Sequence, residues 1–210
     1  MINNLNLVNK SYEVVFIMLV SITFLTSLRS LQNDLTNKER ISLQLSTFVT
    51  LIASMHYFLM INNKQNIHIY RYFDWFFTTP VLLIDLCILL DIYDFNFILE
   101  LVGYNSLMLG IGFLGEMEMI SITTSTLIGF IPLFVIFARI YNKIKDTKNK
   151  EKQRLFYTFF SLWSVYGINH FFYSKVNKTT INGIYNILDL CTKGMFGLYI
   201  YNKSWSSLVL

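Results

Sequence analysis

Seven apolar blocks, separated by short polar segments, occupy almost the whole chain of 210 residues. Because a transmembrane helix needs about 20 apolar residues, a chain of this length has room for about seven or eight membrane crossings at most. Only 14% of the residues are charged, against about 25% in an ordinary soluble domain. The pattern excludes a water-soluble globule and predicts one all-α domain over residues 1–210, a bundle of seven transmembrane helices. The predicted spans are 12–32, 41–61, 70–91, 97–115, 119–140, 155–174 and 180–202.

The most basic stretch of the chain runs from Arg139 to Arg154, between the fifth and sixth blocks. Cytoplasmic loops of membrane proteins carry an excess of Lys and Arg, so we expect this stretch to lie inside the cell. With seven spans, the N terminus is then outside and the C terminus inside. This topology accounts for the net charge of +4, and the sequence indicates neither a nucleic-acid partner nor a metal site.

The third block carries four polar side chains on one helical face. Arg71, Asp74, Thr78 and Asp85 follow one another at intervals of 3, 4 and 7 residues, which places them within roughly 60° of one another around a helix. Asp74 and Asp85 are about 16 Å apart at 1.5 Å per residue. The two carboxylates therefore serve different points along one path through the membrane.

The seventh block places Asp189 and Lys193 one helical turn apart, near the middle of a span. A lysine at this depth does not reach the membrane surface easily. One interpretation is an ion pair within the helix that only makes insertion tolerable. The other is a covalent Schiff base on Lys193 whose positive charge is held by carboxylates of the third and seventh blocks. The polar face of the third block favours the second interpretation.

These residues resemble the microbial (type 1) rhodopsins. The run from Arg71 to Pro80, with Asp85, resembles their third helix, and Asp189 with Lys193 resembles their retinal-binding seventh helix. In the sixth block, Trp163 and Tyr166 are similar to the aromatic pair beside retinal. The fourth block resembles the stretch near the ionone ring at Gly103, Asn105, Met108, Gly110 and Gly112.

The resemblance implies a role for each matching residue. Lys193 would hold all-trans retinal as a protonated Schiff base, with Asp74 as primary counterion and proton acceptor. Asp189 would be the second counterion, and Arg71 would close the extracellular side. Thr78 would hydrogen-bond Asp74 one turn away.

The resemblance also implies a flat apolar pocket for the retinal chain. Trp75, Trp163 and Tyr166 would sandwich it. Thr192 beside the lysine would shift absorption to shorter wavelength, whereas Leu82 favours green absorption. The other expected pocket residues are Thr79, Asn105, Met108 and Gly112.

Asp85 stands where pumping members keep a carboxyl proton donor. Within its run of Leu and Ile, burial would favour the neutral acid in the dark. Asp91 and Asp94 follow closely, so the alternative is that Asp85 lies at the cytoplasmic end of the helix and is solvated.

His56 of the second block resembles a histidine of the proteorhodopsin branch that bonds the counterion. Such a bond would couple Asp74 to a group that titrates near neutral pH. The alternative is a histidine bonded elsewhere in the bundle.

Three positions depart from the common pattern or leave alternatives open. Gly167 replaces the proline expected after Tyr166, and His170 stands where an aromatic residue is usual. Arg29 is expected to snorkel to the membrane surface or, less favoured, to face a neighbouring protomer together with Phe24.

The expected function is a light-driven outward proton pump, based on Asp74, Thr78 and Asp85. The alternatives are a light-gated ion channel, which short-looped viral rhodopsins make plausible, and a sensory photoreceptor, favoured only by Thr192. None of these is an enzyme. The expected partners are the lipid bilayer, protons or other small ions, and further copies of the chain in a trimer or pentamer. The expected location is a cell's plasma membrane, a virus-infected host among the candidates.

Overall fold

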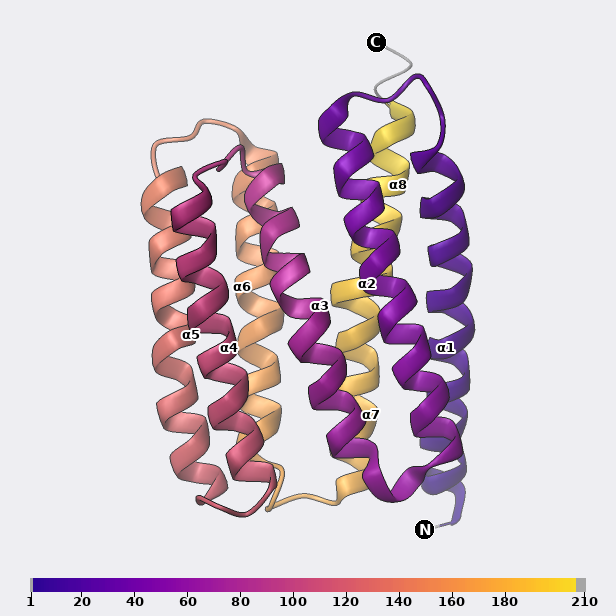
Figure 1. Cartoon of the computed structure of the whole chain (residues 1–210). Helices are drawn as coiled ribbons and strands as arrows, with labels where there is room; N and C mark the ends of the chain where they lie inside the picture. Colours follow the sequence, from indigo (N-terminus) through magenta and orange to yellow (C-terminus); the bar gives the residue numbers. More distant parts are fainter. Residues whose placement is uncertain (1, 207–210) are drawn as a thin grey trace. The chain divides into compact units, whose positions relative to one another are not determined.

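The computed structural model describes residues 2–206, and their side chains from residue 8 onward. Within these residues the fold is helical throughout (Figure 1). The elements are α1 (Ile2–Ser30), α2 (Asn37–Asn62), η1 (Lys64–Asn66), α3 (Ile67–Leu89), α4 (Phe95–Glu116), α5 (Ile122–Ile144), α6 (Lys150–Phe171), α7 (Lys178–Asp189), η2 (Leu190–Met195) and α8 (Phe196–Ser206). The seven predicted spans are therefore confirmed as helices, and the fold is that of a seven-transmembrane helical protein.

Several helices begin a few residues before the predicted apolar block, because polar side chains cap them. The hydroxyl of Thr36 accepts a hydrogen bond from the backbone N–H of Glu39, and the Glu39 carboxylate accepts one from the backbone N–H of Thr36. This reciprocal pair starts α2 four residues ahead of its predicted span. Asn149 caps α6 in a similar way, through the N–H groups of Glu151 and Lys152.

The predicted seventh span has a feature that its sequence did not indicate. α7, η2 and α8 follow one another without a gap from Lys178 to Ser206, and η2 is a π-helix over Leu190–Met195. A π-helix is wider than an α-helix and is common at functional sites. Lys193 lies inside this segment.

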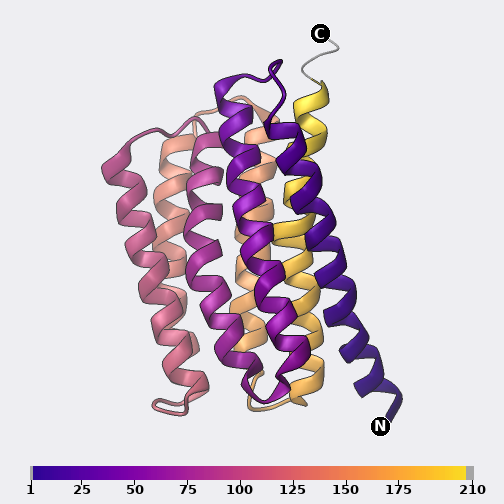
Figure 2. The same cartoon turned by 45° about the vertical axis from the view of Figure 1, so that its right-hand side comes forward.

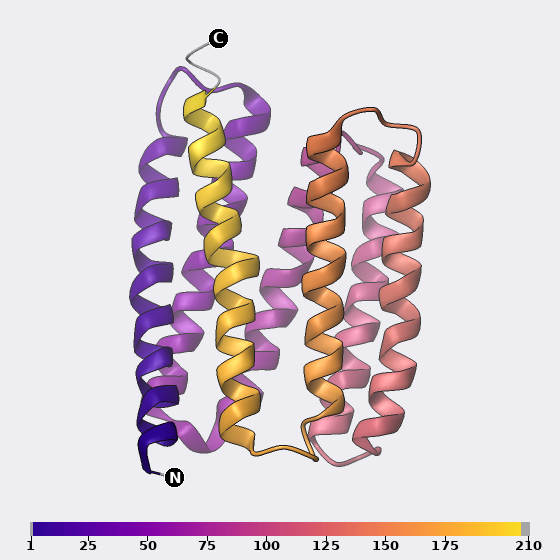
Figure 3. The same cartoon turned by 180° about the vertical axis from the view of Figure 1, so that it is seen from behind.

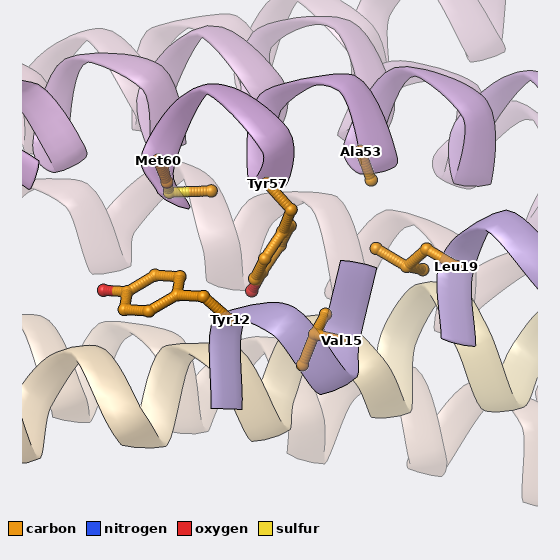
Figure 4. Close-up of a cluster of buried hydrophobic side chains, with 6 residues drawn as sticks. All are labelled: Tyr12, Val15, Leu19, Ala53, Tyr57 and Met60. Atoms are coloured by element: carbon orange, nitrogen blue, oxygen red, sulfur yellow. The ribbon is translucent and has the colours of Figure 1, made fainter. Parts of the chain in front are cut away.

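The chain divides into two compact units, each described here by itself. The first contains residues 2–85 and 186–206, and the second contains residues 86–185. In the first unit α1 packs along α2, and α8 packs against both helices, as two views show (Figures 2 and 3). Figure 4 shows part of the core between α1 and α2, where the buried side chains are Tyr12, Val15, Leu19, Ala53, Tyr57 and Met60.

In the second unit α5 packs against α4 on one side and α6 on the other. Aromatic rings fill the α5–α6 contact: the ring of Phe137 meets the Trp163 ring edge-on, 5.7 Å between centroids. Gly167 is explained by the same contact, because a Cβ at this position would lie 2.7 Å from Cζ of Phe130. A larger residue, the expected proline included, would displace the Phe130 ring.

The outer faces of the helices are apolar. Five helices among the described residues are long and apolar enough to cross a membrane, α1 to α5. Large side chains such as Phe24, Leu127 and Ile131 are more than half exposed. This is the surface expected of helices whose solvent is lipid. α6 is not among these five helices, and its first turn carries Lys150, Glu151 and Lys152.

The expectation that Arg29 snorkels is wrong, because its side chain is only 1% exposed. Its guanidinium binds Asp34 of the α1–α2 loop at 2.8 Å and donates to the carbonyl of Ser204 in α8 at 2.6 Å. It also lies over the ring of Trp205, 4.0 Å from the centroid. Arg29 thus ties the α1–α2 loop to α8 within the first unit.

The stability that the Arg29–Asp34 ion pair contributes depends on pH. The Arg29 guanidinium, bonded to Asp34, holds the pKa of that carboxyl below its usual 3.8. The folded protein therefore favours the ionised form, so the charge contributes stability above pH 3.8 that is lost as the pH falls through the folded-state pKa.

We predict that Asp34→Asn lowers the thermal midpoint of the protein near pH 7, and that the difference from wild type closes below about pH 4. The measurement is thermal denaturation of both proteins between pH 7 and pH 3. Asp146→Asn removes an exposed carboxylate from the α5–α6 loop and serves as the control. A difference that stays constant down to pH 3 would contradict the prediction.

Candidate functional site

Lys193 is buried in the first unit with a side chain 1% exposed. Among the described residues, Lys193 is the one lysine in the buried class. Its Nζ donates a hydrogen bond to Oδ2 of Asp74 on α3 and lies 3.2 Å from Oδ1 of Asp189, one turn earlier. Both carboxylates have no exposed side-chain surface. The structure therefore brings together the lysine and the two counterions that the sequence predicted.

Arg71 supplies the second positive charge of the cluster. Its Nη1 donates to Oδ2 of Asp189 at 3.0 Å, and its Nη2 donates to Oδ1 of Asn186 at 2.9 Å. Its guanidinium carbon lies 6.0 Å from the ring centroid of Tyr57 and 5.9 Å from that of Trp75. Two cations and two carboxylates thus meet in one buried cluster, which is the condition for keeping charges inside a membrane.

Asp189 receives hydrogen bonds from three side chains on two helices, α2 and α3. Besides Arg71, the hydroxyl of Tyr57 on α2 donates to its Oδ2 at 2.8 Å, and the indole N–H of Trp75 on α3 donates to its Oδ1 at 3.1 Å. Asp74 differs, because its Oδ1 is buried without a hydrogen-bond partner in the described part of the chain. Donors stabilise a charged carboxylate, so Asp189 is the better held anion and Asp74 has an oxygen left to accept a proton.

Two members of this network were not among the predicted site residues. Tyr57 was next to the predicted His56, and Asn186 lies one turn before Asp189. The Asn186 side chain also donates to the hydroxyl of Ser11 on α1 at 2.8 Å. Asn186 therefore links Arg71 to the half-buried Ser11 of another helix. Asn186 precedes Asp189 by three residues and so lies on the same helical face, which was the signal in the sequence that could have identified it.

The three threonines of the predicted site each bond the main chain one turn earlier. Thr78 donates to the carbonyl of Asp74 at 2.8 Å, so the predicted bond between these residues exists, with the backbone as acceptor. Thr79 donates to the carbonyl of Trp75 at 2.8 Å, and Thr192 to that of Leu188 at 2.9 Å.

The predicted bond between His56 and Asp74 is wrong for this structure. Nδ1 of His56 lies 2.9 Å from the carbonyl oxygen of Ile52 on its own helix. The alternative, a histidine bonded elsewhere, describes the observed contact.

Asp85 is buried on α3, with 1% of its surface exposed. Leu82 and Leu83 beside it are buried as well. Both oxygens of its carboxyl are buried without a hydrogen-bond partner among the described residues, as is the hydroxyl of Ser42 on α2. The alternative of a solvated Asp85 is therefore wrong. Asp91 occupies the turn after α3, and Asp94 caps α4 instead.

The remaining predicted pocket residues belong to the second unit. Trp163 and Asn105 are buried, while Tyr166, Met108 and Gly112 are partly buried. The Tyr166 ring stacks on that of Tyr185, with 6.0 Å between centroids. Their position against retinal stays a prediction.

Comparisons with known proteins show which family the chain resembles. A family model described as bacteriorhodopsin-like protein matches residues 9–207. Green-light absorbing proteorhodopsin of a gamma-proteobacterium is 26% identical over 185 residues, which cover 79% of this chain and 74% of that protein. Bacteriorhodopsin of Halobacterium salinarum is 29% identical over 184 residues, covering 74% and 68%. The crystal structure of viral rhodopsin OLPVRII is similar with a TM-score of 0.85 and 26% identity, covering 97% of this chain and 99% of that one.

Proposed function

Because the chain belongs to the bacteriorhodopsin-like family, we propose that it is a light-driven pump that carries protons outward across the membrane. Members of this family hold retinal through a Schiff base to a lysine, and Lys193 is the buried lysine here. Bound there, all-trans retinal supplies a light-driven change of shape that loosens the hold of the Lys193 nitrogen on its proton.

The residues of the first unit fit this cofactor. A cationic nitrogen in the membrane needs compensating anions, and Asp74 and Asp189 are in place around Nζ of Lys193. The buried and unpartnered Oδ1 of Asp74 supplies a ready acceptor atom. Asp74 is therefore the residue that takes the proton from the Lys193 nitrogen, while Asp189, held by three donors, stays charged and keeps the cluster together.

The observation that carries the proposal is the second buried carboxyl of α3. Asp85 stands eleven residues after Asp74, about 16 Å along the helix axis. Its burial beside Leu82 and Leu83 favours a protonated carboxyl that returns a proton to the Lys193 nitrogen. One acceptor and one donor at different depths give the transport a direction.

The direction follows from the proposed orientation. If the basic stretch from Arg139 to Arg154 is inside, then the Asp85 end of α3 is inside and the Arg71 end is outside. Protons then enter past Asp85 and leave past Arg71, where Asn186 continues the hydrogen-bonded chain to Ser11. We place the protein in the plasma membrane of a cell, a virus-infected host included, as a trimer or pentamer.

We predict an outward photocurrent that keeps its sign well beyond zero membrane potential. The measurement is patch-clamp current against voltage in cells that express the full chain with added retinal. Lys193→Ala is the control and should give no photocurrent. A current that reverses at the equilibrium potential of a permeant ion would show a channel, and slow photocycling without current would show a sensor.

We predict that Asp85→Asn slows reprotonation of the Lys193 nitrogen by about 100-fold above pH 7, a typical loss for a general acid. Flash photolysis of the pigment measures this step. Asp91→Asn is the matched control, because it removes an exposed carboxylate beyond the same end of α3 and asparagine tolerates the positive φ found there. Reprotonation as fast as in wild type would exclude Asp85 as the donor.

A further inference from the structure

A second group of buried polar side chains joins three helices of the second unit. Glu116 is the last residue of α4, Ser125 lies in the first turn of α5, and His170 lies in the last turn of α6. The Glu116 and His170 side chains are 2% and 9% exposed, and Ser125 is fully buried. No step of the proposed pump uses these residues.

The three side chains form a linear chain of contacts. Nε2 of His170 lies 3.0 Å from Oγ of Ser125, which donates a hydrogen bond to the carbonyl of Ile122 at 3.0 Å. Nδ1 of His170 lies 3.5 Å from Oε1 of Glu116. Nδ1 of His170 and Oε1 of Glu116 are both buried without a hydrogen-bond partner among the described residues.

A glycine makes this arrangement possible. A Cβ at Gly115 would lie 2.1 Å from Oγ of Ser125 and 3.4 Å from Nε2 of His170. Any other residue would push the serine away from the imidazole. The absence of a side chain at Gly115 therefore leaves room for the Ser125–His170 contact.

The hydrogen bonds that His170 can make depend on which of its ring nitrogens carry a proton. Since the hydroxyl proton of Ser125 goes to Ile122, its oxygen is an acceptor toward Nε2 of His170, which must then carry a proton. Oε1 of an ionised Glu116 is only an acceptor, and it faces Nδ1. A proton on Nδ1 would face Oε1 of Glu116, 3.5 Å away, whereas a ring without that proton leaves two acceptors, Nδ1 and an ionised Oε1, facing each other.

The charged residues that follow Glu116 and His170 in the sequence are Glu118, Lys175 and Lys178, and all three are exposed. The two lysine amines lie over the rings of Phe171 and Tyr173, at 3.4 and 5.4 Å. The Tyr173 ring is 6.4 Å from the imidazole, and Asn169 binds the carbonyl of Ile181 on α7 instead. Glu116 is the ion-pair partner of His170 within the described residues.

We propose that Glu116, His170 and Ser125 form a proton-binding site of their own, in which one bound proton makes His170 an imidazolium paired with the Glu116 carboxylate. Proton binding ties the end of α4 to the end of α6 through the first turn of α5. Loss of the proton leaves a carboxylate and a ring nitrogen facing each other without a hydrogen bond. The site thus couples proton uptake to the packing of these three helix ends.

The test reads the charge of His170 directly and does not depend on transport. Retinal-loaded full-length protein, labelled with ¹⁵N-histidine and held in lipid vesicles with a chelator, is studied by solid-state NMR at pH 7. The ¹⁵N resonances of His170 are assigned as those that are present in the wild-type spectrum and missing from the spectrum of His170→Gln. We expect both ring nitrogens of His170 to be protonated in the wild type. In Glu116→Gln the imidazolium fraction should fall at least threefold, while Glu118→Gln should leave it unchanged.

A neutral His170 in the wild type, or the same imidazolium fraction in Glu116→Gln, would overturn the proposal. Pigment absorbance reports whether each variant has folded. If Glu116→Gln forms no pigment, Ser125→Ala gives the second test, because it removes the partner of Nε2 alone. The proposal then requires a changed Nε2 resonance with Nδ1 still protonated, and an unchanged Nε2 would contradict it.

Discussion

The structure of the first unit depends on the need to neutralise a lysine amine where water is absent. A lone charge in this position costs several kcal/mol, so the chain must supply anions at hydrogen-bonding distance. It does so from two elements, with Asp74 on α3 and Asp189 on the lysine's own helix. The Lys193–Asp74 ion pair joins α3 to η2, the π-helical segment Leu190–Met195 that contains the lysine.

The two carboxylates look alike in the sequence and become different in the fold. Asp189 collects donors from Arg71, Tyr57 and Trp75, whereas Asp74 keeps one buried oxygen without a partner. This difference is the reason that we propose Asp74, and not Asp189, as the acceptor of the proton from the lysine nitrogen. In the second unit, Oε1 of Glu116 and Nδ1 of His170 are also buried without a hydrogen-bond partner among the described residues, and we propose that a proton is taken up there.

The sequence was sufficient for features that depend on spacing within one helix. Block lengths gave the spans to within a few residues, except that α1 begins ten residues early, and the four-residue interval predicted the Asp189–Lys193 pair. Contacts between residues far apart in the sequence were either not predicted or predicted wrongly. Arg29 is buried because Ser204 and Asp34 receive its guanidinium, and Ser204 lies 175 residues away. Tyr57 and Asn186 looked like ordinary residues until helix packing aimed them at the cluster, and His56 is turned toward its own backbone.

The most direct test of the account is to locate the bond to retinal. Sodium borohydride reduces a Schiff base to a stable secondary amine, so treatment of the illuminated pigment followed by peptide mass spectrometry identifies the modified residue. The account predicts one retinyl group on the peptide that contains Lys193, and neither pigment nor adduct in Lys193→Ala. Retinyl on another lysine, or a normal pigment in Lys193→Ala, would contradict it.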